Sequence, residues 1–259
     1  MDVRCHELRE AAMASPTAKQ ESVASSSRVA RGHAVYVVPS FLDESECDQL
    51  MAAASHHIGT DPKSPKLRLA VTKLADAQAL CDALIRRTLA LVEDQLPALG
   101  QTLFGQSTVL ADLDVRFSLN EPAVNVYGAT GDFGEHEDGH MLTMLVPLSQ
   151  ASAFEGGGTP PSGRRTHTHA HMHTHTCTHG CMYIRTGGTA FWPTDADAES
   201  FSVAAHDETL HEIRDMDERA KHVMLPSRGT LLLFVGSVTH AGVAVRSGER
   251  MVCLWRPSI

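Results

Sequence analysis

Long apolar runs are absent from this 259-residue chain. A helix that spans a bilayer needs about 20 consecutive apolar residues, and no stretch of the sequence approaches that length. Residues 1–10 include five charged side chains where a secretory signal would need an apolar segment. We therefore expect an unsecreted, cytoplasmic protein with no membrane partner. Targeting to an organelle by the N-terminal segment is the alternative.

An excess of positive charge is also missing, since 22 Lys and Arg stand against 31 Asp and Glu, giving a formal net charge of −9. This balance argues against a broad electrostatic grip on nucleic acid. Closely spaced cysteines are few as well, because the six cysteines lie far apart except for Cys177 and Cys181. A chain of this length needs no disulfides to hold its fold, so we expect reduced thiols. The sequence carries no signal for the oligomeric state.

Short strand-like runs dominate the second half of the chain. From about residue 114, brief apolar runs alternate with Gly, Pro, Asp and Asn, which is typical of an all-β sandwich or barrel. Before them, a β-branched run at 33–38 predicts a strand. A capping box of Asp43 and Glu46 opens one predicted supporting helix, and an amphipathic stretch over 75–95 predicts another. The apolar runs of the second half are 115–119, 123–127, 141–148, 230–235 and 251–255.

The composition divides the chain into a tail, a domain and an insertion. Residues 1–32 are rich in Ala, Ser and charge, so we expect a disordered tail there and a folded domain over 33–259. Residues 160–189 are a low-complexity tract rich in His and Thr, flanked by near-repeats of Gly and Thr. We interpret the tract as an insertion whose removal would leave a hairpin. Without a fixed scaffold, its His and Cys residues are not expected to hold a metal with defined coordination.

His136 and Asp138 lie two residues apart in a segment expected to be extended, so their side chains should point the same way. His240 follows the apolar strand predicted at 230–235. Two histidines and one carboxylate can form a facial triad on non-haem Fe(II), which leaves open positions for a cosubstrate and O2. We predict that His136, Asp138 and His240 bind the metal and that no catalytic residue lies beyond the metal centre. His140 is expected to be a loop residue.

Arg250 lies ten residues beyond His240, on what should be the next strand. A guanidinium near such a metal offers a fork for the distal carboxylate of a dicarboxylate. Arg246 is a competitor for this role.

Taken together, these motifs resemble the Fe(II)- and 2-oxoglutarate-dependent dioxygenases, and most closely their prolyl 4-hydroxylase-like branch. The motifs that carry the resemblance are H-x-D at 136–138, H-x-G at 240–242 and G-x-R at 248–250. Short flanking motifs also resemble those of this branch, from about Tyr36 to Trp255 when the tract is left out. These motifs are FLDESEC at 41–47, N-x-Y-G-x-x-G at 125–131, L-T-x-L-V-P-L at 142–148, F-E-G-G-G-T at 154–159 and L-P-S-R-G at 225–229.

The resemblance implies a mainly β fold, a double-stranded β-helix or jelly roll with N-terminal supporting helices. It implies that Arg250 and Tyr127 contact 2-oxoglutarate. The implied cofactors are Fe(II), 2-oxoglutarate as cosubstrate and O2, with ascorbate. The implied reaction hydroxylates a peptidyl side chain, prolyl in the first instance, or a small molecule, with release of succinate and CO2.

Two other functions stay open. Collagen-type prolyl hydroxylases commonly carry Lys where this chain has Arg250, and Arg and Lys are not interchangeable at a carboxylate site. Arg250 and Arg256 resemble the paired arginines of nucleic-acid demethylases in the same superfamily, which makes a demethylase one alternative. The F-E-G-G-G-T word and the negative net charge argue against it. The other alternative is a non-catalytic jelly roll that binds a ligand without a metal.

Overall fold

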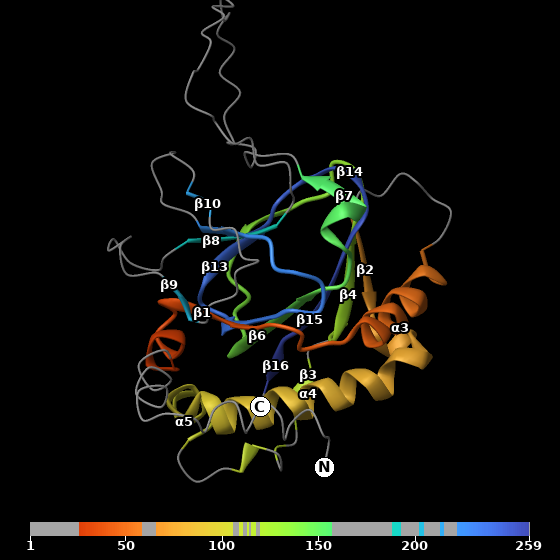
Figure 1. Cartoon of the computed structure of the whole chain (residues 1–259). Coiled ribbons are helices and arrows are strands. Elements are labelled where there is room, and N and C mark those ends of the chain that lie inside the picture. Colours follow the sequence, from red (N-terminus) through yellow and green to blue (C-terminus); the bar gives the residue numbers. More distant parts are fainter. Residues whose placement is uncertain are drawn as a thin grey trace, which may run out of the picture.

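Two antiparallel sheets face each other in the computed structural model (Figure 1). The larger sheet has seven strands in the order β2-β4-β15-β6-β12-β1-β9, and the smaller has five in the order β10-β11-β8-β13-β5. Among the pairings, only that of β1 with β9 is parallel in the part of the chain that the structure describes. The described residues are 26–58, 66–105, 109–110, 113, 115–117, 120–156, 188–192, 202–204, 213–214 and 222–258.

The strands are short, as the spacing of the apolar runs predicts. Those of the larger sheet are β1 (Ala34–Val38), β2 (Lys66–Ala70), β4 (Ala123–Tyr127), β6 (Leu142–Pro147), β9 (Ser202–Ala204), β12 (Leu231–Val235) and β15 (Arg250–Trp255). Those of the smaller sheet are β5 (Phe133–His136), β8 (Thr189–Trp192), β10 (Ile213–Arg214), β11 (His222–Met224) and β13 (Thr239–Gly242). Two further pairs are β7 (Phe154–Gly156) with β14 (Val245–Gly248), and β3 (Arg116–Phe117) with β16 (Pro257–Ser258).

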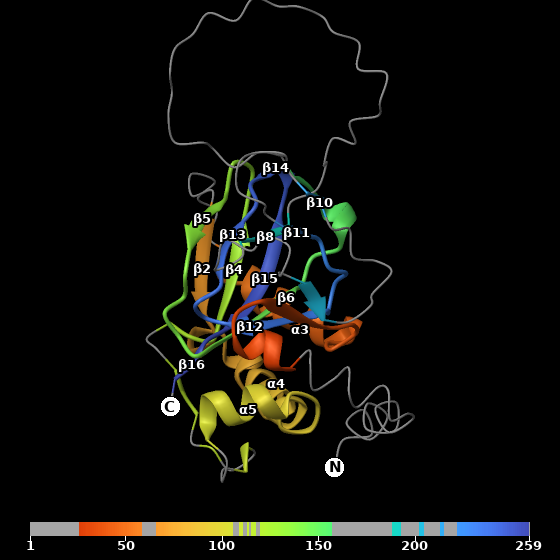
Figure 2. The ribbon, with the colours of Figure 1, turned by 90° about the vertical axis from the view of Figure 1, so that its left-hand side faces the viewer.

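The α-helices over 44–55, 75–95 and 97–104 lie on the outer side of the larger sheet, away from the smaller one, whereas the short helix over 151–153 lies beside β7 (Figures 1 and 2). Two of them begin where the sequence predicts, since Asp43 and Glu46 form a capping box and the helix over 75–95 has its predicted bounds. The helix that begins at Pro97 was not predicted. None of the described helices is long and apolar enough to cross a membrane. The elements are α3 (Glu44–Ser55), η1 (Val71–Lys73), α4 (Ala75–Gln95), α5 (Pro97–Phe104) and η3 (Ala151–Ala153).

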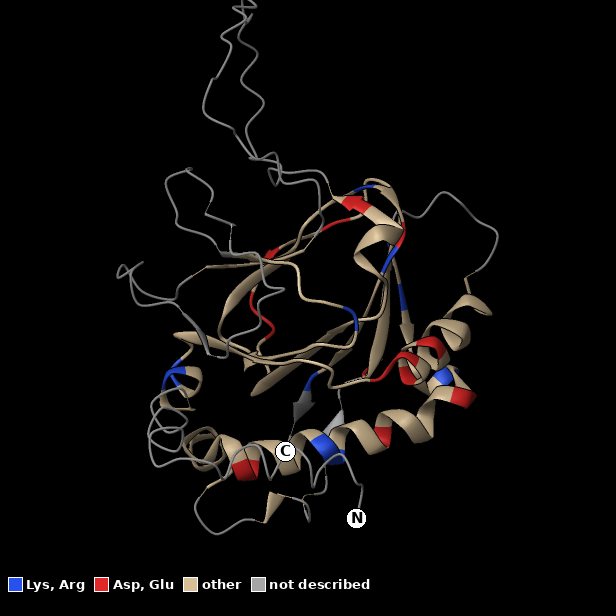
Figure 3. Cartoon of the chain, in the orientation of Figure 1, with Lys and Arg blue, Asp and Glu red and all other residues tan. Residues whose placement is uncertain are grey.

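Apolar faces of helix and sheet form one main core. The buried side chains of α4, among them Leu84 and Val92, join the buried strands β6, β12 and β15 in a single cluster. Acidic residues gather in the first turn of α3, where their negative charge stabilises the positive end of the helix dipole (Figure 3).

The predicted fold class is confirmed: the chain is mainly β, a jelly roll with N-terminal supporting helices.

The predicted boundaries of tail and tract differ from the structure at their inner ends. Residues 26–30 are helical, Val29 is fully buried, and Ser26 Oγ accepts a hydrogen bond from the Leu99 amide, so packing begins before residue 33. Thr189 belongs to β8 and is buried. The flanking words do not pair as a hairpin, since β7 pairs with β14 while β8 pairs with β11 and β13. Residues 1–25 and 157–187 lie outside the described residues.

Candidate metal centre and cosubstrate pocket

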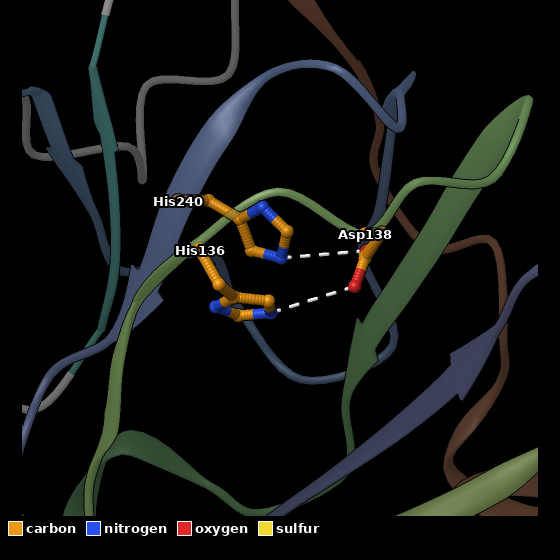
Figure 4. A group of neighbouring side chains, drawn as sticks. All are labelled: His136, Asp138 and His240. Carbon is orange, nitrogen blue, oxygen red and sulfur yellow. Dashed lines mark ion pairs between the residues drawn. The ribbon is translucent and has the colours of Figure 1, made fainter.

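His136, Asp138 and His240 come together at one point between the sheets (Figure 4). His136 ends β5 and His240 lies on β13, and the two are direct partners in the register of these neighbouring strands. Asp138 follows β5 by two residues. The ligating atoms of the three side chains all lie within 4.8 Å of one another. Strand pairing therefore unites residues that stand about a hundred positions apart in the sequence.

Both imidazoles are fixed in the form that a metal requires. His136 Nδ1 lies 2.8 Å from the Gly134 carbonyl oxygen, and His240 Nδ1 lies 3.0 Å from that of Val238. A carbonyl oxygen only accepts, so Nδ1 carries a proton, and in the neutral ring Nε2 then carries the lone pair that can bind a metal. The two Nε2 atoms lie 3.4 Å and 3.5 Å from the Asp138 carboxylate oxygens. Burial lowers the pKa of His240 and so favours the neutral ring, although the Asp138 carboxylate acts in the opposite direction.

Asp138 is held as a carboxylate by several donors. Thr143 Oγ1 donates to its Oδ2 at 2.6 Å, and Arg256 Nη1 donates to its Oδ1 at 2.6 Å. Burial alone would raise the pKa of Asp138, but the hydrogen bond from Thr143 and the positive charge of Arg256 hold it well below its ordinary value. A buried carboxylate and two imidazoles whose Nε2 atoms face it are a donor set that fits non-haem Fe(II).

A close backbone approach fixes the loop that carries Asp138. The Asp138 amide donates to the Gly236 carbonyl at 2.9 Å. A Cβ at Gly236 would lie 1.9 Å from the His140 carbonyl oxygen, so only glycine fits between the two chain segments. His140 lies in a bend outside the ligand group, as predicted.

Arg250 lines the same pocket as His136 and His240, a hollow of about 420 Å³ including its open mouth. Its side chain is buried, with Nη1 donating to the Gly188 carbonyl at 2.8 Å and Nη2 to Thr189 Oγ1 at 3.1 Å. Within the described ranges no carboxylate pairs with this guanidinium, and burial lowers its pKa. A buried cation with neutral acceptors alone is a fitting site for an anionic ligand group.

Strand alternation places the pocket residues of the larger sheet. Side chains two apart on a strand share a face, so β15 and the residue after it present a row of alternating residues to the pocket. β4 presents Asn125 and Tyr127 in the same way, and the register sets Tyr127 directly opposite Arg250. Tyr127 is buried, and its hydroxyl accepts a hydrogen bond from Asn125 Nδ2 at 3.3 Å. The β15 row comprises Arg250, Val252, Leu254 and Arg256.

The structure distinguishes the three arginines that the sequence offers. Arg250 is buried in the pocket, whereas Arg246 is exposed on β14 and does not line it. Arg256 lines the pocket but is bound to Glu121 and to Asp138. Sequence reasoning assigned no role to Glu121. The signal for it was weak, because an isolated Glu before a Pro reads as a turn residue.

Three further pocket or ligand contacts were also not predicted. Thr143 and Asn125 lie within the motifs at 142–148 and 125–131 that carry the family resemblance. Strand alternation could have placed Asn125 on the same face as Tyr127. Arg68 lies on β2, a strand that was not predicted from the sequence. The Arg68 Nη1 donates a hydrogen bond to Asn125 Oδ1 at 3.1 Å.

No protein-family model and no curated protein sequence matches the chain. Solved structures do match. The viral collagen prolyl hydroxylase of Paramecium Bursaria Chlorella virus-1, in complex with 2-oxoglutarate, is 17% identical with a TM-score of 0.48, over 89% of this chain and 99% of that one. A Pseudomonas putida prolyl-4-hydroxylase is 12% identical with a TM-score of 0.48, over 92% of this chain and 99% of that one.

A third similar structure is SnoN, a non-haem α-ketoglutarate-dependent epimerase from nogalamycin biosynthesis. It is 17% identical with a TM-score of 0.46, over 90% of this chain and 82% of that one. The likeness is one of fold, and the activities named here are those of the similar proteins.

Proposed function

We propose that the chain is an Fe(II)- and 2-oxoglutarate-dependent dioxygenase that hydroxylates a peptidyl side chain, prolyl in the first instance, or a small molecule. One observation carries the proposal. The Nε2 atoms of His136 and His240 meet the Asp138 carboxylate at a pocket whose wall holds Arg250. This arginine is a buried cation with only neutral partners among the described residues.

In this proposal His136, Asp138 and His240 hold the metal on one face. When bound, Fe(II) would supply the activation of O2 that couples decarboxylation of 2-oxoglutarate, to succinate and CO2, with hydroxylation of the substrate. The protein's part is to bind and orient. Thr143 and Arg256 keep Asp138 ionised and in place, and the carbonyl groups of Gly134 and Val238 keep the two rings in the ligating tautomer.

Arg250 is proposed to bind the distal carboxylate of 2-oxoglutarate. Its guanidinium would neutralise that carboxylate at the end of the pocket away from solvent. Tyr127 lies across the register from it, and no acceptor binds the Tyr127 hydroxyl proton among the residues that the structure describes, so this O–H is available to a ligand oxygen. Aliphatic side chains of Leu145, Val252 and Leu254 line the same hollow and limit water around the cosubstrate.

The demethylase alternative is less well supported by the contacts of Arg256. Its guanidinium is bound to the carboxylates of Glu121 and Asp138 and so is not a free cation for a polyanion. The binding-module alternative does not explain why the ligating atoms of His136, Asp138 and His240 lie within 4.8 Å of one another. A cytoplasmic location and a requirement for ascorbate stay predictions.

Residues 160–187 are proposed to be an insertion that the reaction does not need. The two last residues of the predicted tract are kept in the domain, because Gly188 and Thr189 bind Arg250. A deletion of 160–187 should therefore retain 2-oxoglutarate binding, whereas a deletion that also removes Gly188 and Thr189 should weaken it.

The proposed function is tested by measuring which substrate class stimulates consumption of 2-oxoglutarate by the purified full chain with Fe(II), ascorbate and O2. Proline-containing peptides, small molecules and methylated oligonucleotides form the three panels. Stimulation by peptides or small molecules, with hydroxylated product, supports the proposal. Formaldehyde release from methylated oligonucleotides alone would replace it with the demethylase, and no consumption in any panel would favour the binding module.

A further inference from the structure

A buried cluster of one glutamate between two arginines lies beside Asp138. The Glu121 side chain is 1% exposed, and its Oε1 accepts from Arg256 Nε at 2.7 Å, from Arg256 Nη2 and from Arg68 Nη2. The remaining nitrogen of Arg256, Nη1, donates to Asp138 Oδ1 at 2.6 Å. The Arg256 guanidinium is therefore held on one edge by Glu121 and presents its other edge to the metal-binding carboxylate.

Arg68 extends the cluster in the opposite direction. Its Nη1 donates to Asn125 Oδ1 at 3.1 Å, and Asn125 Nδ2 donates to the Tyr127 hydroxyl at 3.3 Å. Tyr127 in turn lies next to Arg250, whose guanidinium carbon is 5.7 Å from the centre of the phenol ring. An unbroken series of hydrogen bonds thus joins the proposed metal ligand to the proposed 2-oxoglutarate contact.

Sheet order explains why Glu121 stands at the branch point of this series. β4 lies between β2 and β15, and Glu121 comes two residues before β4. A carboxylate at that position is flanked by Arg68 from β2 on one side and by Arg256, which follows β15, on the other. The register pairs Arg68 with Asn125, which carries the contact on toward Tyr127.

The cluster is poorly explained as a source of folding stability. Burying ions costs several kcal/mol each and is offset only when every polar atom is satisfied. Glu121 Oε2 is buried and has no hydrogen-bond partner among the described residues, since Oε1 accepts all three donors. Replacing such a cluster with apolar residues is often neutral for stability, so the cluster is better explained by the groups that it positions.

We propose that Glu121 is a positioning residue that serves both halves of the site through two arginines. Through Arg256 it fixes the Asp138 carboxylate for metal binding, and through Arg68 it fixes Asn125 and Tyr127 for 2-oxoglutarate binding. This inference rests on the proposed function, because it assumes that these two groups bind a metal and a cosubstrate.

The two arms predict different defects. Arg256→Met removes a donor to Asp138 and should weaken metal binding roughly 10- to 100-fold, the usual cost of losing a partner of a metal ligand. Arg68→Met should leave metal binding unchanged and weaken 2-oxoglutarate binding at saturating metal. Glu121→Gln should cause both defects, because it loosens both arginines. Arg246→Met, on the exposed β14, is the matched control and should cause neither.

The test is calorimetric titration of the full chain without O2, first with Mn(II) and then with 2-oxoglutarate at saturating Mn(II), for the wild type and the four variants. Circular dichroism shows which variants fold, and the single-arginine variants test the inference even where Glu121→Gln does not fold. Separate defects for Arg256→Met and Arg68→Met support the proposal. Equal affinities in wild type and both variants, or the same defect in both, would overturn it while leaving the proposed function intact. A wild type that binds neither Mn(II) nor 2-oxoglutarate would overturn the proposed function as well.

Discussion

His136 and His240 are direct partners across the β5 and β13 strands, with ring centres 4.3 Å apart. Each ring donates its Nδ1 proton to the carbonyl of the residue two positions before it. The same local device therefore prepares both rings, and it uses only backbone groups. Neither ring needs to reorient or change its tautomer to present Nε2 to a metal.

Loss of a ligand side chain should abolish metal binding. Asp138→Ala and His240→Ala remove one of three donors, and each should leave no measurable Mn(II) affinity in a calorimetric titration. His140→Ala is the control, because His140 lies near the group but contributes no ligand to it. Equal metal loss in the His140 variant would contradict the assignment.

The Thr143 hydroxyl should matter through the hydrogen bond at 2.6 Å that it donates to Asp138. Thr143→Val keeps the shape of the side chain and removes the donor, so the Mn(II) dissociation constant should rise by roughly 10- to 100-fold. Thr143→Ser keeps the donor and should stay close to wild type. If the Ser and Val variants bind Mn(II) equally, the hydroxyl has no role in holding Asp138.

Arg250→Met should weaken 2-oxoglutarate and spare the metal. A hydrogen-bonded charge pair is worth about 1.5–3 kcal/mol, so the dissociation constant of 2-oxoglutarate should rise by roughly 10- to 100-fold. Mn(II) affinity should not change, because Arg250 makes no contact with the three ligands. Titrations of both, beside the exposed control Arg246→Met, check this. Metal loss in Arg250→Met without metal loss in His240→Ala would contradict the account.

Gly236→Ala should destabilise the fold at the Asp138 loop. The new Cβ would lie 1.9 Å from a backbone oxygen of His140, which cannot move without displacing the loop. We expect a loss of about 1–3 kcal/mol in the free energy of unfolding, measured by urea titration. Gly134→Ala, where a Cβ meets nothing within 4 Å, should cost much less. Similar losses at both positions would contradict the close approach.

Local patterns in the sequence predicted several of the elements and the three side chains that come together as a candidate metal group. The capping box at Asp43 and the helix over 75–95 depend on short-range spacing, and both are present as predicted. His136 and Asp138 were predicted to face one point by strand alternation, although β5 ends at His136 and Asp138 lies beyond it. His240 was predicted from its place after an apolar strand. Arg250 was chosen over Arg246 by motif resemblance, and burial of Arg250 supports that choice.

Contacts that depend on sheet order were beyond the sequence. Glu121 meets Arg68 and Arg256 only because β4 is flanked by β2 and β15, and no local pattern encodes which strands are neighbours. The mistaken hairpin between the words that flank the tract has the same cause. Those words were close in sequence once the tract was left out, yet β7 and β8 pair with different strands.

The measurement that tests the central claim most directly is succinate release from 2-oxoglutarate, with Fe(II), ascorbate and O2, by the wild type and by Asp138→Ala. The account predicts succinate from the wild type even without a second substrate, and none from the variant. Equal succinate from both proteins, or none from a folded wild type that has bound Fe(II), would contradict it.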